Sequence, residues 1–149
     1  MTIRDLTEDD APAAAALTVG WSAADYRAVA RGDFPDRFCL VAAESANVSG
    51  LILASVVPPD AEILNVFVRS SIRRQGLGSA LLRAAIARMK TAGARRTWLE
   101  VRESNVAALS IYGTAGFRRT GRRLGYYNAP KENALVLERD LELNLETKS

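Results

Sequence analysis

Apolar, β-branched residues in the first half of the chain fall into runs of strand length that turn residues separate. Residues 38–43, 50–57 and 62–68 are such runs, and their length and composition are typical of buried strands. Residues 44–49 separate the first two runs, and Pro58-Pro59-Asp60 breaks the chain before the third. We therefore expect these strands to form an antiparallel meander.

One strand and two helices are expected before this meander. Residues 2–6 have a strand-like pattern, and the alanine-rich segment 11–19 indicates a helix with Pro12 in its first turn, where proline is tolerated. Ser22 is a favourable N-cap for a second helix that extends to about residue 30.

The middle of the chain alternates between a helical and a strand pattern. Residues 78–89 have apolar positions at helical spacing, and residues 97–101 again have the composition of a strand. Because a helix separates strand 97–101 from strand 62–68, we expect these two strands to pair in parallel. The helix would bury one face, formed by Leu82, Ala85, Ile86 and Met89.

A capped helix and two strands are expected to follow. Ser104 and Asn105 are favourable N-cap residues for a helix that ends near residue 115. Strands are expected at residues 117–123 and 134–141, with a loop over residues 125–132 between them.

The length and the apolar content of the chain suit one domain. The chain has 149 residues, 48% of them apolar, and a domain of this size buries roughly 68–70% of the surface that its unfolded chain exposes. The sequence therefore predicts a single α/β (α+β) domain over residues 1–149, with a mixed central sheet of about six to seven strands and about four helices.

The composition limits the chemistry that the chain can perform. It contains no histidine, which removes the commonest general base and the commonest metal ligand, so we expect no metal site. Proton transfer must then use carboxylates, tyrosine, lysine or water. Cys39, the single cysteine, lies in an apolar run and is expected to be a buried structural thiol.

Charge and hydropathy indicate the setting of the protein. The net charge of +3 is mildly basic and the arginines are scattered among acidic residues, so we expect no direct binding of nucleic acid, while an anionic cofactor would balance part of the charge. The charged N-terminus is unlike a signal peptide, and no uncharged stretch is long enough for a membrane span. We expect a cytoplasmic protein, as a monomer or a weak dimer.

A glycine-containing segment between a strand and a helix indicates a phosphate site. In residues 73–78, Arg-Arg-Gln-Gly-Leu-Gly, Gly76 and Gly78 allow close approach of the backbone to a ligand, and a helix N-terminus attracts anions. A P-loop is excluded because no glycine precedes a lysine, and a dinucleotide fingerprint lacks its third glycine, where Leu81 stands. Taken alone, the segment favours a glycine-rich helix start that binds nothing.

This segment and several others resemble one enzyme family. The pattern Arg/Gln-x-x-Gly-x-Gly resembles the pyrophosphate loop of the GNAT N-acetyltransferases, and the segments 64–68, 98–105 and 108–117 match that family at the expected spacing. The resemblance covers nearly the whole chain and is greatest to the RimI-type alanine N-acetyltransferases, which modify a ribosomal protein. Gly20 and Asn133 depart from the pattern of that subfamily, where proline and aspartate are usual, and leave the acceptor open.

The resemblance implies a GNAT fold and a pair of residues for proton transfer. Glu100 would act as the general base through a water molecule, and Tyr112 would protonate the leaving sulfur. On the residues alone, Glu100 could instead be an outward strand residue that pairs with Arg102 or Arg96, and Tyr112 could be a core aromatic that packs against Leu109.

The resemblance also implies which residues contact acetyl-CoA. The backbone N–H of Val68, with Val66 as its neighbour, would meet the acetyl carbonyl. Asn105 would contact the pantetheine arm, although helix capping explains an asparagine there equally well. The expected set is Val66, Phe67, Val68, Arg73, Arg74, Gln75, Gly76, Leu77, Gly78, Ser79, Asn105 and Tyr112.

The acceptor side is expected at aromatic residues in two segments. Trp21 and the pair Tyr126 and Tyr127 would contact the substrate, although paired aromatics at a sheet edge often serve packing alone. The leading hypothesis is direct acetyl transfer from acetyl-CoA to the N-terminal α-amine of a protein, such as an Ala-initiated ribosomal protein. A small-molecule amine or a protein lysine is the alternative acceptor, and an acyl-CoA-binding sensor module without catalysis is the alternative of another class.

Overall fold

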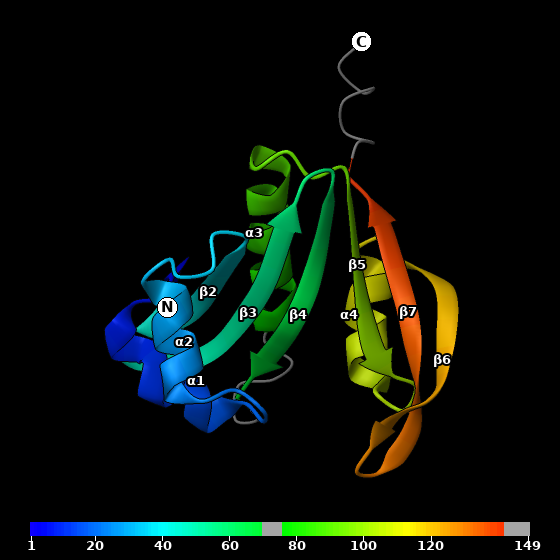
Figure 1. The fold of residues 1–149 in the computed structure, drawn as a ribbon, viewed down its shortest axis with the longest axis horizontal. Coiled ribbons are helices and arrows are strands. Elements are labelled where there is room, and N and C mark those ends of the chain that lie inside the picture. The colour runs from blue at the N-terminus through cyan, green and yellow to red at the C-terminus, as the bar shows by residue number, and fades with distance from the viewer. Residues whose placement is uncertain (70–75, 142–149) are drawn as a thin grey trace.

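Seven strands form one sheet in the described part of the chain, residues 1–69 and 76–141, in the order β1-β2-β3-β4-β5-β7-β6. This computed structural model (Figure 1) confirms the predicted mixed sheet, together with four α-helices within those residues. The strands are β1 (Thr2–Asp5), β2 (Arg37–Glu44), β3 (Asn47–Val57), β4 (Asp60–Val68), β5 (Arg96–Arg102), β6 (Arg118–Asn128) and β7 (Lys131–Asp140). The helices are the 3-10 turn η1 (Glu8–Asp10), α1 (Ala11–Leu17), α2 (Ala23–Ala30), α3 (Leu77–Thr91) and α4 (Val106–Thr114).

Helices cover both faces of the sheet, as Figure 1 shows. On one face, α1 and α2 pack over β2, β3 and β4 in an apolar cluster that includes Tyr26 and Leu51. On the other face, α3 and α4 join a second cluster that extends from Ile52 in β3 to Leu137 in β7. The face of α3 predicted from its periodicity is buried as expected, since none of its members is more than 5% exposed: Leu82, Ala85, Ile86 and Met89.

Strands β4 and β5 pair in parallel, as predicted, but only over a short length. Three residue pairs join them, and the last of these is Glu62 with Trp98. Beyond that pair β4 continues to Val68 and β5 to Arg102, and Figure 1 shows the two strands moving apart. The sheet is therefore divided into an antiparallel part, β1 to β4, and a second part, β5 to β7.

The N-cap predicted at Ser22 is confirmed. The backbone N–H of Asp25 donates to the hydroxyl of Ser22 at 3.1 Å, and the backbone N–H of Ser22 donates to the carboxylate of Asp25 at 2.8 Å. This reciprocal pair is a capping box, which satisfies two N–H groups that the first turn of a helix leaves without partners.

The prediction of a loop over residues 125–132 is wrong. Strand β6 extends to Asn128 and β7 begins at Lys131, which leaves a two-residue turn between them. Gly125 has a φ of +59° and lies where the β6–β7 register shifts, and its N–H donates to the side-chain oxygen of Asn133 at 2.8 Å. The glycine therefore forms a bulge inside a strand. Its signal in the sequence resembles that of a loop because both structures need a backbone conformation that glycine adopts readily.

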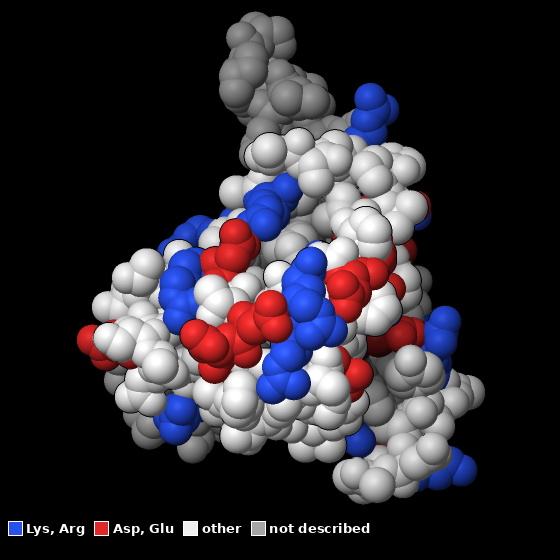
Figure 2. Space-filling view, turned by 60° about the vertical axis from the view of Figure 1, so that its left-hand side comes forward, with Lys and Arg blue, Asp and Glu red and all other residues white. Residues whose placement is uncertain are grey.

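Charged side chains of both signs are interspersed on the surface shown in Figure 2. Exposed ion pairs of the molecule include Arg31 with Asp33 at 3.1 Å and Arg96 with Asp60 at 3.0 Å. Exposed ion pairs contribute at most about 1 kcal/mol each, so the two apolar clusters dominate the stability of the fold. Among the described helices, none has both the length and the apolar content to span a bilayer.

Substituting Gly50 in β3 should destabilise the fold, because a Cβ there would lie 2.9 Å from the carbonyl oxygen of Phe67 and 3.2 Å from the side chain of Leu81. We expect Gly50→Ala to lower the free energy of unfolding by about 1–3 kcal/mol. Gly113→Ala is the matched control, since a Cβ at Gly113 in α4 meets nothing within 4 Å, and it should be stabilising by about 0.5–1 kcal/mol. Urea unfolding of both variants tests this, and equal effects would contradict it.

Candidate functional site

Two carboxylates lie where β4 and β5 separate. Glu62 occupies the last position of β4 that pairs with β5, opposite Trp98. Glu100 stands two residues beyond Trp98 on β5, and because side chains alternate along a strand it lies on the same face of the sheet. Burial, and then the negative charge of Glu100, raise the pKa of Glu62, while Arg123 and Arg37 oppose this shift.

Glu100 is mostly buried and is paired with an arginine. Its side chain is 12% exposed, and Oε2 lies 2.6 Å from Nε of Arg123. The angle of this contact is not that of a hydrogen bond, so Oε2 accepts none from the described residues. Pairing with Arg102 or Arg96 is not seen, because Arg102 binds Glu132 at 3.2 Å and Arg96 binds Asp60.

Tyr126 and Tyr127, predicted on the acceptor side, lie next to Glu100. Their rings meet edge to face with centroids 5.1 Å apart. The interaction of the Tyr126 hydroxyl with Glu100 raises the pKa of Tyr126, and the guanidinium of Arg123 lies 5.2 Å from the centre of the Tyr126 ring. Burial, followed by the charge of Glu100, raises the pKa of Tyr127, whose ring packs against the guanidinium of Arg102 at 4.2 Å.

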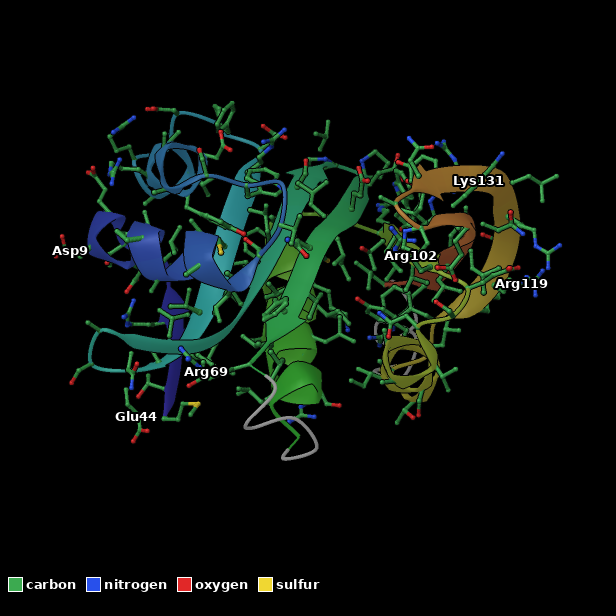
Figure 3. The ribbon with its side chains drawn as sticks, turned by 90° about the horizontal axis from the view of Figure 1, so that it is seen from below. Asp9, Glu44, Arg69, Arg102, Arg119 and Lys131 are labelled. Atoms are coloured by element: carbon green, nitrogen blue, oxygen red, sulfur yellow. The ribbon has the colours of Figure 1, made fainter. Side chains whose placement is uncertain are left out.

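Arg102 shows how the β6–β7 hairpin is held beside β5. It donates to the backbone carbonyl of Pro130 at 2.9 Å, and its partner Glu132 also accepts from the backbone N–H of Ser104 at 2.5 Å. In Figure 3 the side chain of Arg102 lies beside the hairpin that bears Lys131. These contacts fix the strand end that carries Tyr127.

Tyr112 is a buried tyrosine in α4. It is 7% exposed and packs edge to face against Phe117, with ring centroids 5.5 Å apart. Burial, together with Tyr127, raises the pKa of Tyr112 to about 12, so its hydroxyl keeps its proton at neutral pH. Tyr127 interacts electrostatically with both Tyr112 and Glu100, the two residues that were predicted to transfer protons.

The start of α3 has the form of an anion site. Gly76 is its N-cap at a φ of +77° and supplies no side-chain cap, so among the described residues no side chain caps the first N–H groups at the positive end of the helix. A Cβ on Gly76 would meet nothing within 4 Å, whereas one on Gly78 would lie 3.3 Å from Ile111. The positive φ thus favours glycine at position 76, whereas a Cβ at position 78 would require the Ile111 side chain to shift by a few tenths of an ångström. Three predicted cofactor residues fall outside the described residues: Arg73, Arg74 and Gln75.

At the end of β4, every second backbone N–H points to the side where β4 and β5 separate. The N–H of Arg69 donates to the carbonyl of Ser49 in β3 at 2.8 Å, and the Arg69 side chain reaches back to Val48 (Figure 3). Because successive N–H groups of a strand alternate in direction, those of Val68 and Val66 point away from β3, to the side from which β5 has moved. The Val66 and Val68 side chains pack towards α3, and that of Phe67 packs on the opposite face.

Asn105 caps α4, as one of its two predicted roles requires. Its side-chain oxygen accepts a hydrogen bond from the backbone N–H of Ala108 at 3.1 Å. The amide nitrogen of the same side chain takes no part in the cap. Contact with a cofactor is therefore compatible with capping and stays a prediction.

Trp21 lies on the α1–α2 side of the same region. Its ring packs against Tyr26, with centroids 5.7 Å apart, and the guanidinium of Arg37 lies 5.5 Å from the ring centre of Trp21 and 4.6 Å from that of Phe34. Since Arg37 lowers the pKa of Glu62 through its charge, a continuous series of contacts and charges leads from Trp21 to the two carboxylates.

Cys39 is the buried thiol that the sequence predicted. It is 3% exposed, and burial raises its pKa to about 12. A thiol that is neither accessible nor ionised is a poor nucleophile.

Comparison with known proteins identifies the family. The model of the acetyltransferase (GNAT) family matches residues 2–117. The chain belongs to this family. The [Ribosomal protein bS18]-alanine N-acetyltransferase of Escherichia coli (strain K12) is 33% identical over 96 residues, which cover 63% of this chain and 65% of that protein. The enzyme of the same name from Salmonella typhimurium is 34% identical over 92 residues, which cover 60% of this chain and 62% of that protein. The matches thus span slightly less than two thirds of the length of these relatives.

Solved structures extend the GNAT similarity to nearly the whole chain. The crystal structure of the ribosomal-protein-S18-alanine N-acetyltransferase from Escherichia coli has a TM-score of 0.81 at 28% identity, covering 94% of this chain and 93% of that one. The crystal structure of Arabidopsis thaliana NAA60 in complex with a bisubstrate analogue has a TM-score of 0.83 at 17% identity, and the match covers 93% of this chain and 97% of that one. At this low identity, the similarity to NAA60 shows the fold alone.

Sequence reasoning missed two residues that the structure places at the site, Glu62 and the partner arginine Arg123. A charged residue at the start of the run 62–68 was the available sign for Glu62, because a buried strand rarely carries an unpaired carboxylate. The available sign for Arg123 was its place in the segment 123–127, Arg-Leu-Gly-Tyr-Tyr, which resembles the Arg-x-x-Tyr-Tyr segment of the RimI-type enzymes. Its role depends on the β6–β7 register, which brings it to Glu100.

Replacing Glu62 by glutamine should stabilise the protein at pH 7. A carboxyl whose pKa is higher in the folded than in the unfolded state loses stability as the pH rises past its unfolded pKa, about 4.3, and Glu62 is such a group. We expect Glu62→Gln to raise the free energy of unfolding at pH 7 by up to about 0.5 kcal/mol, and to leave it unchanged below pH ~4. Urea unfolding at both pH values, with Glu103→Gln as the control, tests this. A gain of equal size at both pH values would contradict it.

Proposed function

We propose that this protein transfers an acetyl group from acetyl-CoA to the N-terminal α-amine of a protein, directly and without an acyl-enzyme. The observation that carries the proposal is the combination of Glu100, a mostly buried carboxylate where β4 and β5 separate, with Tyr112, a buried and protonated phenol. Acetyl transfer to an amine needs a base for the amine and an acid for the leaving sulfur. Membership of the GNAT family supports acetyl-CoA as the donor.

Two parts of the backbone would hold the donor. The uncapped first turn of α3, from Leu77 to Ser79, would bind the pyrophosphate, with Arg73 and Arg74 as further cationic groups. The N–H groups of Val66 and Val68 point to the side where the acetyl thioester would lie. The amide nitrogen of Asn105 would contact the pantetheine arm, while its oxygen caps α4.

The chain's own residues account for each proton. Glu100 takes a proton from the acceptor amine, through a water molecule, as the nitrogen attacks the acetyl carbonyl. The Val68 N–H stabilises the negative charge that forms on the carbonyl oxygen. Tyr112 gives its proton to the sulfur as the carbon–sulfur bond breaks and regains one from solvent. The products are the acetylated amine and free CoA thiol, and Cys39 takes no part because it is buried and protonated.

An α-amine suits a carboxylate base. Its pKa is near 7.7–8.0, against about 10.4 for lysine, so roughly a tenth of it is already neutral at pH 7. The names of the relatives, which are alanine N-acetyltransferases of ribosomal protein bS18, support an Ala-initiated ribosomal protein as the acceptor. Trp21, Tyr126 and Tyr127 would contact its first residues.

One observation favours the alternative acceptor, a small-molecule amine or a protein lysine. Glu62 adds a second carboxylate beside Glu100, and two carboxylates suit a strongly basic amine. The departures from the subfamily pattern at Gly20 and Asn133 also favour another acceptor. Asn133 supports the bulge at Gly125, which precedes the proposed acceptor residue Tyr126.

Labelled acetyl-CoA with an Ala-initiated peptide should yield a product acetylated at its N-terminus, at a rate that rises with pH as the α-amine loses its proton near pH 7.7–8.0. The control is the same peptide with a blocked N-terminus and a free lysine, which should stay unlabelled. Mass spectrometry locates the label. Labelling of lysine or of a small amine alone would favour the alternative acceptor, and no labelling of any amine would favour a non-catalytic acyl-CoA-binding module.

The variants Glu100→Gln and Tyr112→Phe should slow transfer without weakening cofactor binding. General acids and bases contribute about 10²- to 10⁴-fold, so we expect losses of at least about 10²-fold for each, with that of Glu100→Gln greatest below the pKa of the amine. The controls are Glu103→Gln, a neighbouring carboxylate that pairs with Arg122, and Tyr26→Phe, a buried tyrosine of the other cluster. Steady-state kinetics and calorimetry with CoA measure both effects. If the controls lose as much rate as the variants, the roles assigned here are wrong.

A further inference from the structure

We propose that Arg123 is a positioning residue that occupies the place, beside Glu100, of the acceptor's ammonium group and of the water molecule between them, and that it must leave this carboxylate before the acceptor can bind. This inference rests on the proposed function, because it concerns the same base. It adds a step between the free protein and the productive complex, in which one cation replaces another.

The geometry of the pair supports such an exchange. Nε of Arg123 lies 2.6 Å from Oε2 of Glu100, so it fills the position from which a water molecule or an ammonium nitrogen would contact this oxygen. The two members differ in exposure: the Glu100 side chain is 12% exposed, while that of Arg123 is 55% exposed. The carboxylate is therefore held inside the site, and its partner reaches it from the solvent side.

Local structure allows Arg123 to move. It lies at the edge of a register shift in β6, between Arg123 and Tyr127, next to the bulge at Gly125. Strand β6 is also the edge strand of the sheet, so only β7 pairs with it. When Arg123 leaves Glu100 it still has a partner, because its guanidinium already lies 5.2 Å from the centre of the Tyr126 ring.

The charges that face Glu100 come from two sides. Glu62 approaches from β4, and its charge interaction with Glu100 is unfavourable. Arg123, Tyr126 and Tyr127 approach from β6, and of these only Arg123 is a cation. Arg37 acts on Glu62 as well, but Arg123 is the cation that contacts Glu100. An ammonium beside it would add a second cation in the same space, so binding of the two at Glu100 is mutually exclusive.

Arg122 supplies a matched control on the same strand. It pairs with Glu103 at 2.8 Å and its side chain is 44% exposed, so it resembles Arg123 in type, exposure and pairing. It differs in having no contact with Glu100. A general effect of removing one arginine from β6 would therefore appear equally in Arg122→Gln and Arg123→Gln.

The test measures acceptor affinity separately from turnover. Calorimetry gives the Kd of an Ala-initiated peptide in the presence of CoA, and steady-state kinetics at saturating acetyl-CoA give KM and kcat. We expect Arg123→Gln to lower both Kd and KM by about two- to fivefold, the range that an exposed ion pair supports, without a fall in kcat. Arg123→Lys, which restores a cation, should return both values towards wild type, and Arg122→Gln should leave them unchanged.

A double-mutant cycle assigns the effect to Glu100. In a Glu100→Gln background, Arg123→Gln should no longer change the Kd of the peptide, because the carboxylate for which the two cations compete is gone. A Kd that rises in Arg123→Gln, or that matches Arg122→Gln, would overturn the inference. Thermal unfolding of each variant confirms that it is folded.

Failure of this inference is distinct from failure of the proposed function. If the wild type acetylates the peptide but Arg123→Gln binds it as the wild type does, only the inference is wrong. If the wild type acetylates a lysine or a small amine instead, the same comparison is made with that acceptor, and an unchanged Kd again overturns the inference. If no amine is acetylated or bound, both are wrong.

Discussion

The short parallel pairing of β4 with β5 is the constraint on which the rest of the site depends. Three residue pairs join the two parts of the sheet, and the apolar cluster that runs from Ile52 to Leu137 holds them together on the side of α3 and α4. Packing on that face therefore replaces the hydrogen bonds that a longer ladder would provide. Beyond Glu62 and Trp98 the facing edges of the two strands no longer pair with each other.

The polar groups at this separation carry electrostatic strain. Glu62 and Glu100 are brought to one face of the sheet by the register of the last strand pair, where burial and mutual repulsion disfavour two negative charges. Arg123 relieves part of this repulsion, and Tyr126 and Tyr127 of β6 lie beside Glu100. Residues that lower stability in this way are expected where function requires them, which is why the proposed chemistry is centred on Glu100.

Fold and function rest on different observations in this protein. Structures at 17% identity share the architecture, so the sheet and its helices do not by themselves select an acceptor. The family and its donor follow from residues 2–117 and from the start of α3. The proposed contacts with the acceptor come from the segments around Trp21 and Tyr126, which lie beside the α1–α2 packing and next to the bulge at Gly125.

The sequence by itself determined the strands, the helices and the helix caps, because these depend on patterns within a few residues. Apolar periodicity predicted the buried face of α3, and the capping groups of Ser22 and Asn105 lie within three residues of the N–H groups that they bind. The glycine loop and its flanking motifs were likewise local, and they predicted the family. Tertiary structure alone decided that Glu100 pairs with Arg123, 23 residues away, and that Glu62 stands beside it. Such pairs depend on strand register, and the β6–β7 register shifts twice, once in the segment that the sequence had suggested as a loop.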